Sequence, residues 1–289
     1  ADMPEMSYPT AGIILIGNEL LSGKIKDENA TFLAERLREL GVVLERVLVI
    51  PDRAALIGEE VRDMSERYDY VFTSGGVGPT HDDVTLEGVA AAFAVDLYVE
   101  PKLADILNTY FADRITEAHL RMARIPKGST LIWTPKSPWP VYSYHNVFIF
   151  PGVPSILKSK FNSIAERFRS VTIYLRSVYL SIQEGEIAHH LSNLERELNV
   201  MVGSYPRTEK DVDYQVRVTI ESREADHVNV AVDQLLASLD SDALVRLDPS
   251  VSSTESEAQE ELRSSTVNET SDQASDESGS TSSSTRSST

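Results

Sequence analysis

The chain has 289 residues, with 45 Asp and Glu against 27 Lys and Arg, and a formal net charge of −18. This acidic balance argues against a protein that binds nucleic acid by neutralising phosphates, and against one that is held on an anionic membrane surface. The absence of cysteine excludes disulfides, Cys-ligated zinc and thiol nucleophiles. The longest apolar runs are too short to span a bilayer, and no signal-peptide pattern opens the chain, so we expect a cytoplasmic protein.

Short β-branched runs alternate with helical periodicity over the first 170 residues, which predicts an α/β domain with a mostly parallel sheet. Strands are expected at 13–16, 46–50, 70–74 and 147–150. Helices are expected at about 32–40, 54–67, 84–94 and 101–111, and from Pro154 onward, where proline favours the first helical turn. The Pro-rich stretch that precedes Val147 is expected to be irregular.

A second, smaller α+β domain is expected from residue 171 to residue 248. Its predicted order is strand 173–182, helix 185–198, strands 200–205 and 213–221, and helix 225–239. The remaining residues, 249–289, are mostly Ser, Thr and acids with almost no aliphatic side chains. Such a composition cannot offset the entropy of ordering by burial, so we predict a disordered acidic tail.

Polar residues follow each predicted strand of the first domain, where the carboxyl ends of parallel strands form one crevice. After the first strand come Gly17, Glu19, Asp27 and Asn29; after the second, Asp52; after the third, Gly75, Gly76, Gly78, Thr80, Asp82 and Asp83; and after the fourth, Pro151 and Gly152. We expect these residues to form one ligand site.

The loop after the third strand combines glycines, which let backbone N–H groups point at an anion, with carboxylates, which repel phosphate. A divalent cation reconciles the two, because carboxylate oxygens hold ions such as Mg²⁺ and these ions bridge phosphate oxygens. The candidate metal ligands are Asp82, Asp83 and Asp27.

Each of these residues also has an ordinary structural interpretation when it is taken alone. Asp83 is placed to cap the helix that follows it, and Asp52 after Pro51 is a common turn residue. Glu19 and Asp27 are ordinary surface residues, and the PGVP segment (151–154) is a turn into a helix. Only their shared position favours a functional site.

The stretch SGGVGPTHDDVT (74–85) resembles the MoaB/Mog-like molybdopterin-binding fold, in the branch shared by CinA-type proteins and the N-terminal half of FAD synthases. LIGNELLSGKIKDEN (15–29), VIPD (49–52) and FPGVP (150–154) match that branch in the same order. In the second domain, EGEIAHHLSNLE (184–195), GSYP (203–206) and YQVRVTIES (214–222) resemble the small domain that follows in these proteins.

The resemblance implies a three-layer α/β/α domain that binds a pterin or a nucleotide at its strand ends, and a homo-oligomer. It places the family's two catalytic aspartates on Asp83 and Asp52. The CinA-type branch is associated with metal-dependent cleavage of nucleotide pyrophosphates, and the FAD synthase N-terminal half with FAD hydrolysis. The segment TPKSPWPVYSYHN (134–146) departs from the Gly-rich segment of CinA-type proteins, which leaves the substrate open.

We therefore predict metal-dependent hydrolysis of a nucleotide pyrophosphate such as FAD or ADP-ribose, with water as the nucleophile. Asp83, Asp82 and Asp52 are the catalytic candidates. The predicted substrate contacts are Gly75, Gly76, Gly78, Thr80, Gly17, Glu19, Asn29, Pro151 and Gly152. A transferase that adenylylates or otherwise processes a pterin, and a non-catalytic binding module, remain as alternatives.

Overall fold

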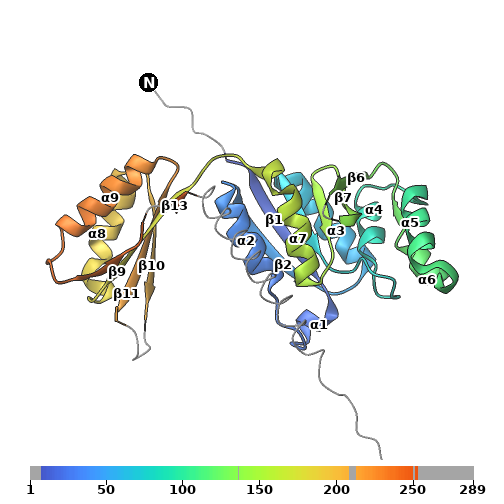
Figure 1. Ribbon diagram of the computed structural model, residues 1–289, viewed down its shortest axis with the longest axis horizontal. Helices are drawn as coiled ribbons and strands as arrows, with labels where there is room; N and C mark the ends of the chain where they lie inside the picture. Colours follow the sequence, from blue (N-terminus) through green and yellow to red (C-terminus); the bar gives the residue numbers. More distant parts are fainter. Residues whose placement is uncertain (1–7, 136, 208–212, 250, 253–289) are drawn as a thin grey trace, which may run out of the picture. The chain divides into compact units, whose positions relative to one another are not determined.

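The computed structural model describes residues 8–135, 137–207, 213–249 and 251–252. The chain forms two compact units, residues 1–171 and residues 172–289 (Figure 1).

The first unit is an α/β domain with one main sheet. Its strands are β1 (Thr10–Ile16), β2 (Val43–Ile50), β3 (Tyr70–Ser74), β4 (Leu97–Val99), β5 (Arg124–Pro126), β6 (Thr130–Thr134), β7 (Ser137–Tyr144) and β8 (Val147–Phe150). Its helices are α1 (Asn18–Leu21), α2 (Asn29–Glu39), α3 (Ala54–Arg67), α4 (Thr85–Ala92), α5 (Pro101–Phe111), α6 (Glu117–Arg121) and α7 (Pro154–Ile164), with 3₁₀ turns at Ala112–Arg114 and Ala165–Phe168.

The main sheet has the strand order β2-β1-β3-β8-β7-β6. The first four of these strands are parallel, and β7 and β6 extend the sheet with antiparallel pairing. The ends of β1, β2, β3 and β8 therefore lie along one edge, as the sequence predicted. The sheet is mixed because β6, β7 and β8 are joined by hairpins, whereas crossover helices join the parallel strands.

Alternating side chains of β1 divide the core into two layers. Ile14 and Ile16 pack with α3 and α4, whereas Ala11, Ile13 and Leu15 pack with α2 and α7. This is the two-residue period of a strand that is buried on both faces. The helices cover both faces of the sheet and give the three layers that the resemblance implies (Figure 1).

The stretch before Val147 is a correction to the sequence prediction. It forms the strands β6 and β7 instead of an irregular segment. Prolines at 138 and 140 hid this strand, because proline cannot donate to a sheet ladder and usually argues against one. Here both prolines lie in the half of β7 before its pairing with β8 begins at Tyr142.

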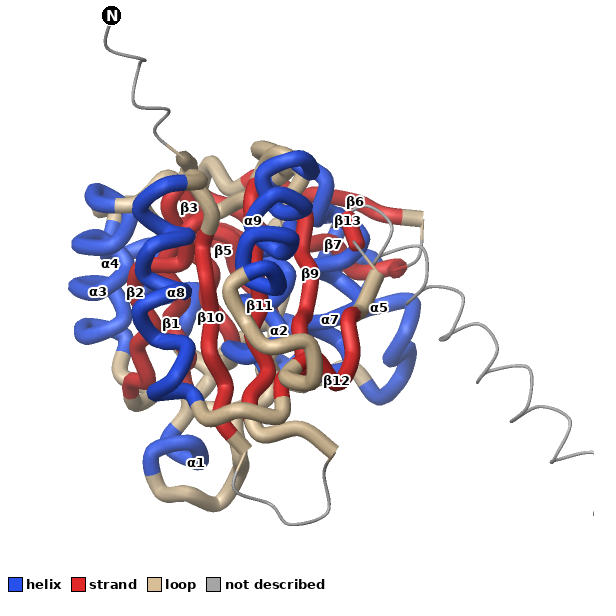
Figure 2. The backbone as a smooth tube through the Cα atoms, turned by 90° about the vertical axis from the view of Figure 1, so that its left-hand side faces the viewer, coloured by secondary structure: helices blue, strands red, loops and turns tan. Residues whose placement is uncertain are grey.

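The second unit is a smaller α+β fold. Its elements are β9 (Tyr174–Leu180), α8 (Glu184–Glu197), β10 (Met201–Pro206), β11 (Val216–Ser222), α9 (Ala225–Ala237), β12 (Leu244–Leu247) and β13 (Val251–Ser252). The antiparallel strands follow the order β10-β11-β9-β12, and α8 and α9 lie together on one face (Figure 2).

The short strand β13 pairs with β9 at Tyr174 and Leu175, so ordered structure continues beyond the expected end of this unit at residue 248. The rest of the predicted disordered tail, residues 253–289, lies outside the described residues. Within the described ranges, no helix is both long and apolar enough to cross a membrane.

Candidate functional site

A pocket of about 670 Å³ lies at the edge where β1, β3 and β8 end. Its wall includes nine of the predicted site residues: Glu19, Asp27, Asn29, Gly75, Gly76, Gly78, Asp83, Pro151 and Gly152. The structure places the other four, Gly17, Asp52, Thr80 and Asp82, outside the lining. Three of the four strand ends that were predicted to converge therefore meet at this pocket, whereas Asp52, after β2, does not line it.

The glycine loop, Gly75 to Gly78, requires glycine at its first two positions for reasons of conformation and space. Gly75 has a φ of +103° and Gly76 a φ of +65°. A Cβ atom on Gly75 would lie 2.2 Å from the carbonyl oxygen of Ile16. The Gly75 N–H donates to the carbonyl of Phe150 at 3.0 Å, so the loop is tied to the neighbouring strand ends.

Asp83 folds back over this loop. A Cβ atom on Gly78 would lie only 2.7 Å from Asp83 Oδ2. The same oxygen accepts a hydrogen bond from the Thr80 N–H at 2.8 Å. Helix α4 begins at Thr85 after Val84, and among the described residues no side chain caps it. The interpretation of Asp83 as a helix cap is therefore wrong, and its carboxylate lies at the pocket.

Asp82 and Asp83 compete for one hydroxyl proton. The Thr80 hydroxyl oxygen lies 2.6 Å from Asp82 Oδ1 and 2.5 Å from Asp83 Oδ2. A hydroxyl carries a single hydrogen, so it cannot donate to both carboxylates at once. The hydrogen bond from Thr80 lowers the pKa of Asp82, which keeps that carboxylate charged. The turn therefore has more negative oxygen atoms than donors, which favours a cation.

Asp52 lies beside the pocket and not in its wall. Its Oδ2 accepts a hydrogen bond from the Asn18 N–H at 2.8 Å, so Asp52 fixes the start of α1. Burial raises the pKa of Asp52, and the charges of Glu19 and Asp82 raise it further. These three carboxylates therefore form one electrostatically coupled group next to the loop.

Asn29 connects two strand ends inside the pocket. Its side chain is 5% exposed, and its amide Nδ2 donates to Ser74 Oγ at 2.9 Å and to the Gly152 carbonyl at 2.8 Å. Its Oδ1 is buried without a hydrogen-bond partner among the described residues. An unsatisfied buried acceptor is costly, so a ligand group or a cation at this atom would stabilise the site.

Asp27 has a clear structural role at the start of α2. Its Oδ1 accepts a hydrogen bond from the Asn29 N–H at 3.0 Å, and its Oδ2 accepts one from the Ala30 N–H at 3.0 Å. It also lines the pocket. Asp27 therefore binds the first backbone N–H groups of α2 from just before the helix, and it shares the pocket wall with Asp83 and Asn29.

The oxygen atoms at this pocket can be compared with what a divalent cation requires. Within the described residues, no group of three or more His, Asp or Glu is arranged to hold a metal ion. The side-chain oxygen acceptors in the pocket wall include the carboxylates of Glu19, Asp27, Glu28 and Asp83 and the Asn29 Oδ1, which has no partner among the described residues. Mg²⁺ is commonly held by one or two carboxylates together with substrate phosphates, and this donor set fits that pattern.

The wall of the pocket also contains residues that the sequence prediction missed. Trp139 and Tyr142 come from β7, and Lys160 comes from α7. Lys160 is 8% exposed and donates to the carbonyl of Pro140 at 3.1 Å and to that of Trp139. Burial lowers the pKa of Lys160 to about 8.

The position of Lys160 could have been found from the sequence. The buried residues of α7 are Leu157, Lys160, Phe161 and Ile164, which is the spacing of one apolar helix face. A lysine within such a stripe is unusual and indicates a buried charge with a dedicated partner.

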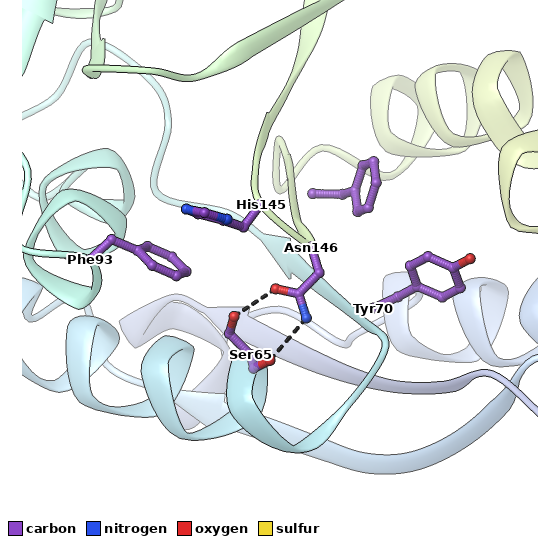
Figure 3. Close-up of a pocket in the computed structure, with 6 residues that line it drawn as sticks. Ser65, Tyr70, Phe93, His145 and Asn146 are labelled. Carbon is purple, nitrogen blue, oxygen red and sulfur yellow. Dashed lines mark hydrogen bonds between the residues drawn. The ribbon is translucent and has the colours of Figure 1, made fainter.

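A second hollow, of about 580 Å³, lies at the other end of the parallel strands, where β3 begins (Figure 3). Its central contact is the Asn146 amide, whose Nδ2 donates to the backbone carbonyls of Ser65 and Tyr68 at 3.0 and 2.8 Å. The Ser65 hydroxyl donates to Asn146 Oδ1 at 2.6 Å. These hydrogen bonds satisfy backbone carbonyls at the end of α3. Asn146 therefore has a structural role, and we assign no ligand to this hollow.

The chain matches two family models in sequence. Residues 12–170 match the model described as a probable molybdopterin binding domain, and residues 159–248 match the FAD synthase middle domain. The overlap falls on α7 and the connection into the second unit.

Similar proteins come from animals and archaea. A probable FAD synthase of Caenorhabditis briggsae is 32% identical over 266 residues, which cover 81% of this chain and 51% of that protein. A protein of Archaeoglobus fulgidus is 34% identical over 77% of this chain and 94% of its own length. The chain thus spans about half the length of the nematode relative.

One solved structure resembles the fold and the sequence together. The crystal structure of the protein CinA from Thermoplasma acidophilum, whose function is described as unknown, is 31% identical, with a TM-score of 0.51. The match covers 55% of this chain and 98% of that one. With its glycine loop at the strand ends and its two matched domains, the chain belongs to the MoaB/Mog-like family of probable molybdopterin binding domains, in the branch shared with CinA and FAD synthases.

Proposed function

We propose that this chain hydrolyses the diphosphate bridge of a nucleotide such as FAD or ADP-ribose, with the help of a divalent cation. The observation that carries the proposal is the position of Asp83, which lies against the glycine loop in the pocket instead of capping α4. A loop that can hold phosphate and a carboxylate that can hold a cation or a water molecule are thereby placed together.

In this proposal the backbone N–H groups of Gly76 and Gly78 hold the diphosphate, and Asp83 orients the attacking water. A bound cation would neutralise charge that develops on the phosphate oxygens. Water adds across the P–O–P bridge, one P–O bond breaks, and two phosphomonoesters leave. Asp82 and Asp52 keep the negative field that attracts the cation, because both lie within electrostatic reach of each other beside the loop.

The relatives support this class of ligand without identifying the substrate. The family model is named for molybdopterin, and the nematode relative is named a probable FAD synthase. A pterin phosphate and a flavin nucleotide both combine a planar ring with a phosphate. We propose hydrolysis, and not transfer, because the apolar wall and the acidic turn leave water as the nucleophile at hand.

The test is to incubate the chain with FAD, ADP-ribose and NAD in water enriched in ¹⁸O, with Mg²⁺, Mn²⁺ or EDTA, and to analyse the products by mass spectrometry. We expect two monophosphates for each molecule cleaved, one of which carries a single ¹⁸O atom, formed only when a metal is present.

Three results would contradict hydrolysis. They are the absence of products with every substrate and metal, equal product formation in EDTA, and transfer of AMP to a pterin acceptor without ¹⁸O. The last result would favour the transferase alternative.

A further inference from the structure

The first half of β7, Ser137 to Pro140, does not pair with β8, although Ser137 pairs with Thr134 of β6 on the other side. In the described part of the sheet, β7 pairs with β8 only from Tyr142 to Tyr144. Pro138 and Pro140 have no N–H to donate. The carbonyls of this half also lie outside the β7–β8 pairing, and buried carbonyls without a donor are costly. The Ser137 hydroxyl supplies one donor, to the Trp139 carbonyl at 2.8 Å.

Lys160 supplies further donors from the neighbouring helix. Its ammonium group donates to the carbonyls of Trp139 and Pro140 and lies 3.5 Å from Ser137 Oγ. In the described residues no carboxylate forms an ion pair with it, so its charge is balanced by backbone carbonyls. Since the rest of α7 is anchored in the core by Leu157 and Phe161, Lys160 fixes this half of β7 to a rigid element.

Trp139 departs from the alternation of its strand, at the point where the pairing of β7 with β6 shifts register. Val141 packs in the layer of α2 and α7, and the two-residue period would place Trp139 there too. Instead Trp139 packs in the layer of α3 and α4, with its ring 6.4 Å from that of Tyr142 at 78°. Both residues line the pocket, together with Met122, Ile156 and the glycine loop.

We propose that Trp139 forms a binding subsite for a planar heterocyclic ring of the ligand, and that Lys160 is the positioning residue of this subsite. The inference rests on the proposed function for one point only, which is that the glycine loop holds the phosphate end. The ring end then reaches the apolar wall, where an indole offers the contact area and the π-face that stacking requires.

The experiment measures binding and not turnover. The full chain is titrated by calorimetry, in the presence of Mg²⁺, with AMP and FMN, which carry a ring and a phosphate, and with ribose 5-phosphate, which lacks the ring. The variants are Trp139→Leu and Trp139→Phe. The matched control is Trp133→Leu, at the other tryptophan of the chain, which is 43% exposed on β6.

We expect Trp139→Leu to weaken AMP or FMN about tenfold, on the scale of one ring–aromatic contact. Trp139→Phe should restore most of the loss, and Trp133→Leu should leave affinity unchanged. The ligand with the larger loss identifies the ring, adenine or flavin. Ribose 5-phosphate should bind all variants equally. No loss with either ring, equal losses for ribose 5-phosphate, or no binding of AMP and FMN to the unaltered chain would overturn the subsite.

The role of Lys160 is tested by Lys160→Met, with Lys102→Met on α5 as the control for loss of a surface charge. In a Trp133→Phe background, Trp139 is the only tryptophan and reports on its own environment. We expect Lys160→Met to shift the emission of Trp139 to longer wavelength and to weaken the ring ligands about fivefold, as a loosened stacking contact would. Unchanged emission and unchanged affinity would overturn the positioning role.

The binding readout separates this inference from the proposed function. Ring-dependent binding without hydrolysis would leave the subsite standing and remove the hydrolase. Hydrolysis at an unchanged rate, together with unchanged ring binding, in Trp139→Leu would support the hydrolase and remove the subsite.

Discussion

The two walls of the pocket are built by different physical means. The glycine-loop wall is set by backbone conformation over a short stretch, where Gly75 and Gly76 adopt positive φ and Asp83 returns to the loop through Thr80. The β7 wall depends on one side chain from the neighbouring helix α7, because Lys160 donates to carbonyls that β8 does not pair. We propose that the first wall holds phosphate and the second a ring.

This difference predicts how each wall fails. A carboxylate on the loop wall can be neutralised without changing its shape, so its loss should affect chemistry and not stability. Removing Lys160 leaves carbonyls unsatisfied, so its loss should affect shape and binding.

The largest effect is expected for Asp83→Asn. Asparagine keeps an oxygen that accepts from the Thr80 N–H, but it removes the charge beside the loop. Metal-dependent hydrolysis should fall about 10³-fold, the scale of losing one key electrostatic contribution, while the melting temperature stays nearly constant. Steady-state kinetics and calorimetric melting measure the two quantities.

Asp69→Asn is the matched control for this charge. Asp69 accepts a hydrogen bond from the Thr10 N–H at 2.8 Å, at the start of β1 and away from the pocket. The turnover of the Asp69→Asn variant should match that of the unaltered chain. If both variants lose turnover equally, or neither does, Asp83 is not the catalytic carboxylate.

Gly78→Ala tests the shape of the same wall. The added methyl would lie 2.7 Å from Asp83 Oδ2, so the carboxylate must move. A displacement of about 1 Å can cost about 10²-fold in rate, and we expect a loss of that size. Gly185→Ala in α8 is the control, because the structure shows nothing within 4 Å of its Cβ position. Full activity in Gly78→Ala would mean that Asp83 does not act from this position.

Asp52→Asn should have a smaller effect, about tenfold, because Asp52 lies outside the pocket lining and contributes through the field of its group. The raised pKa means that Asp52 gains a proton at a higher pH than a free aspartate does. As the pH falls, Asp52 should therefore lose its charge, and the activity that depends on it, at a pH above the range in which a free aspartate is protonated. A pH–rate profile should show this acid limb in the unaltered chain, and its persistence in Asp52→Asn would assign the limb to another group.

The smallest effect is expected at the end of the chain. A chain that ends at Ser252 keeps the pairing of β13 with β9, whereas one that ends at Pro249 loses it. The shorter chain should lose about 1 kcal/mol, a decrease of about 2–4 °C in melting temperature. The chain that ends at Ser252 should melt like the full chain, and a larger loss would show that residues 253–289 contribute to stability. Differential scanning calorimetry of the three lengths decides this.

The glycine-loop wall was predictable from the sequence because its determinants are local. Glycines after a buried strand and polar residues after its neighbours indicate a strand-end site. The sequence could not decide between Asp83 as a cap and Asp83 at the pocket, since the outcome depends on where α4 begins. The β7 wall was missed because Lys160 and Pro140 are 20 residues apart, and no local rule shows that a lysine donates to the carbonyls of a strand that far away in the sequence.

The most direct test of the central claim is the metal dependence of nucleotide binding. The described residues lack a three-carboxylate metal site, so the account requires a cation that the loop wall and the diphosphate hold together. Calorimetric titration with α,β-methylene-ADP, which cannot be cleaved at its bridge, measures this without turnover. We predict binding that is about tenfold tighter in Mg²⁺ or Mn²⁺ than in EDTA, with the difference abolished in Asp83→Asn. Equal affinity in metal and in EDTA, or a metal effect that persists in Asp83→Asn, would contradict the account.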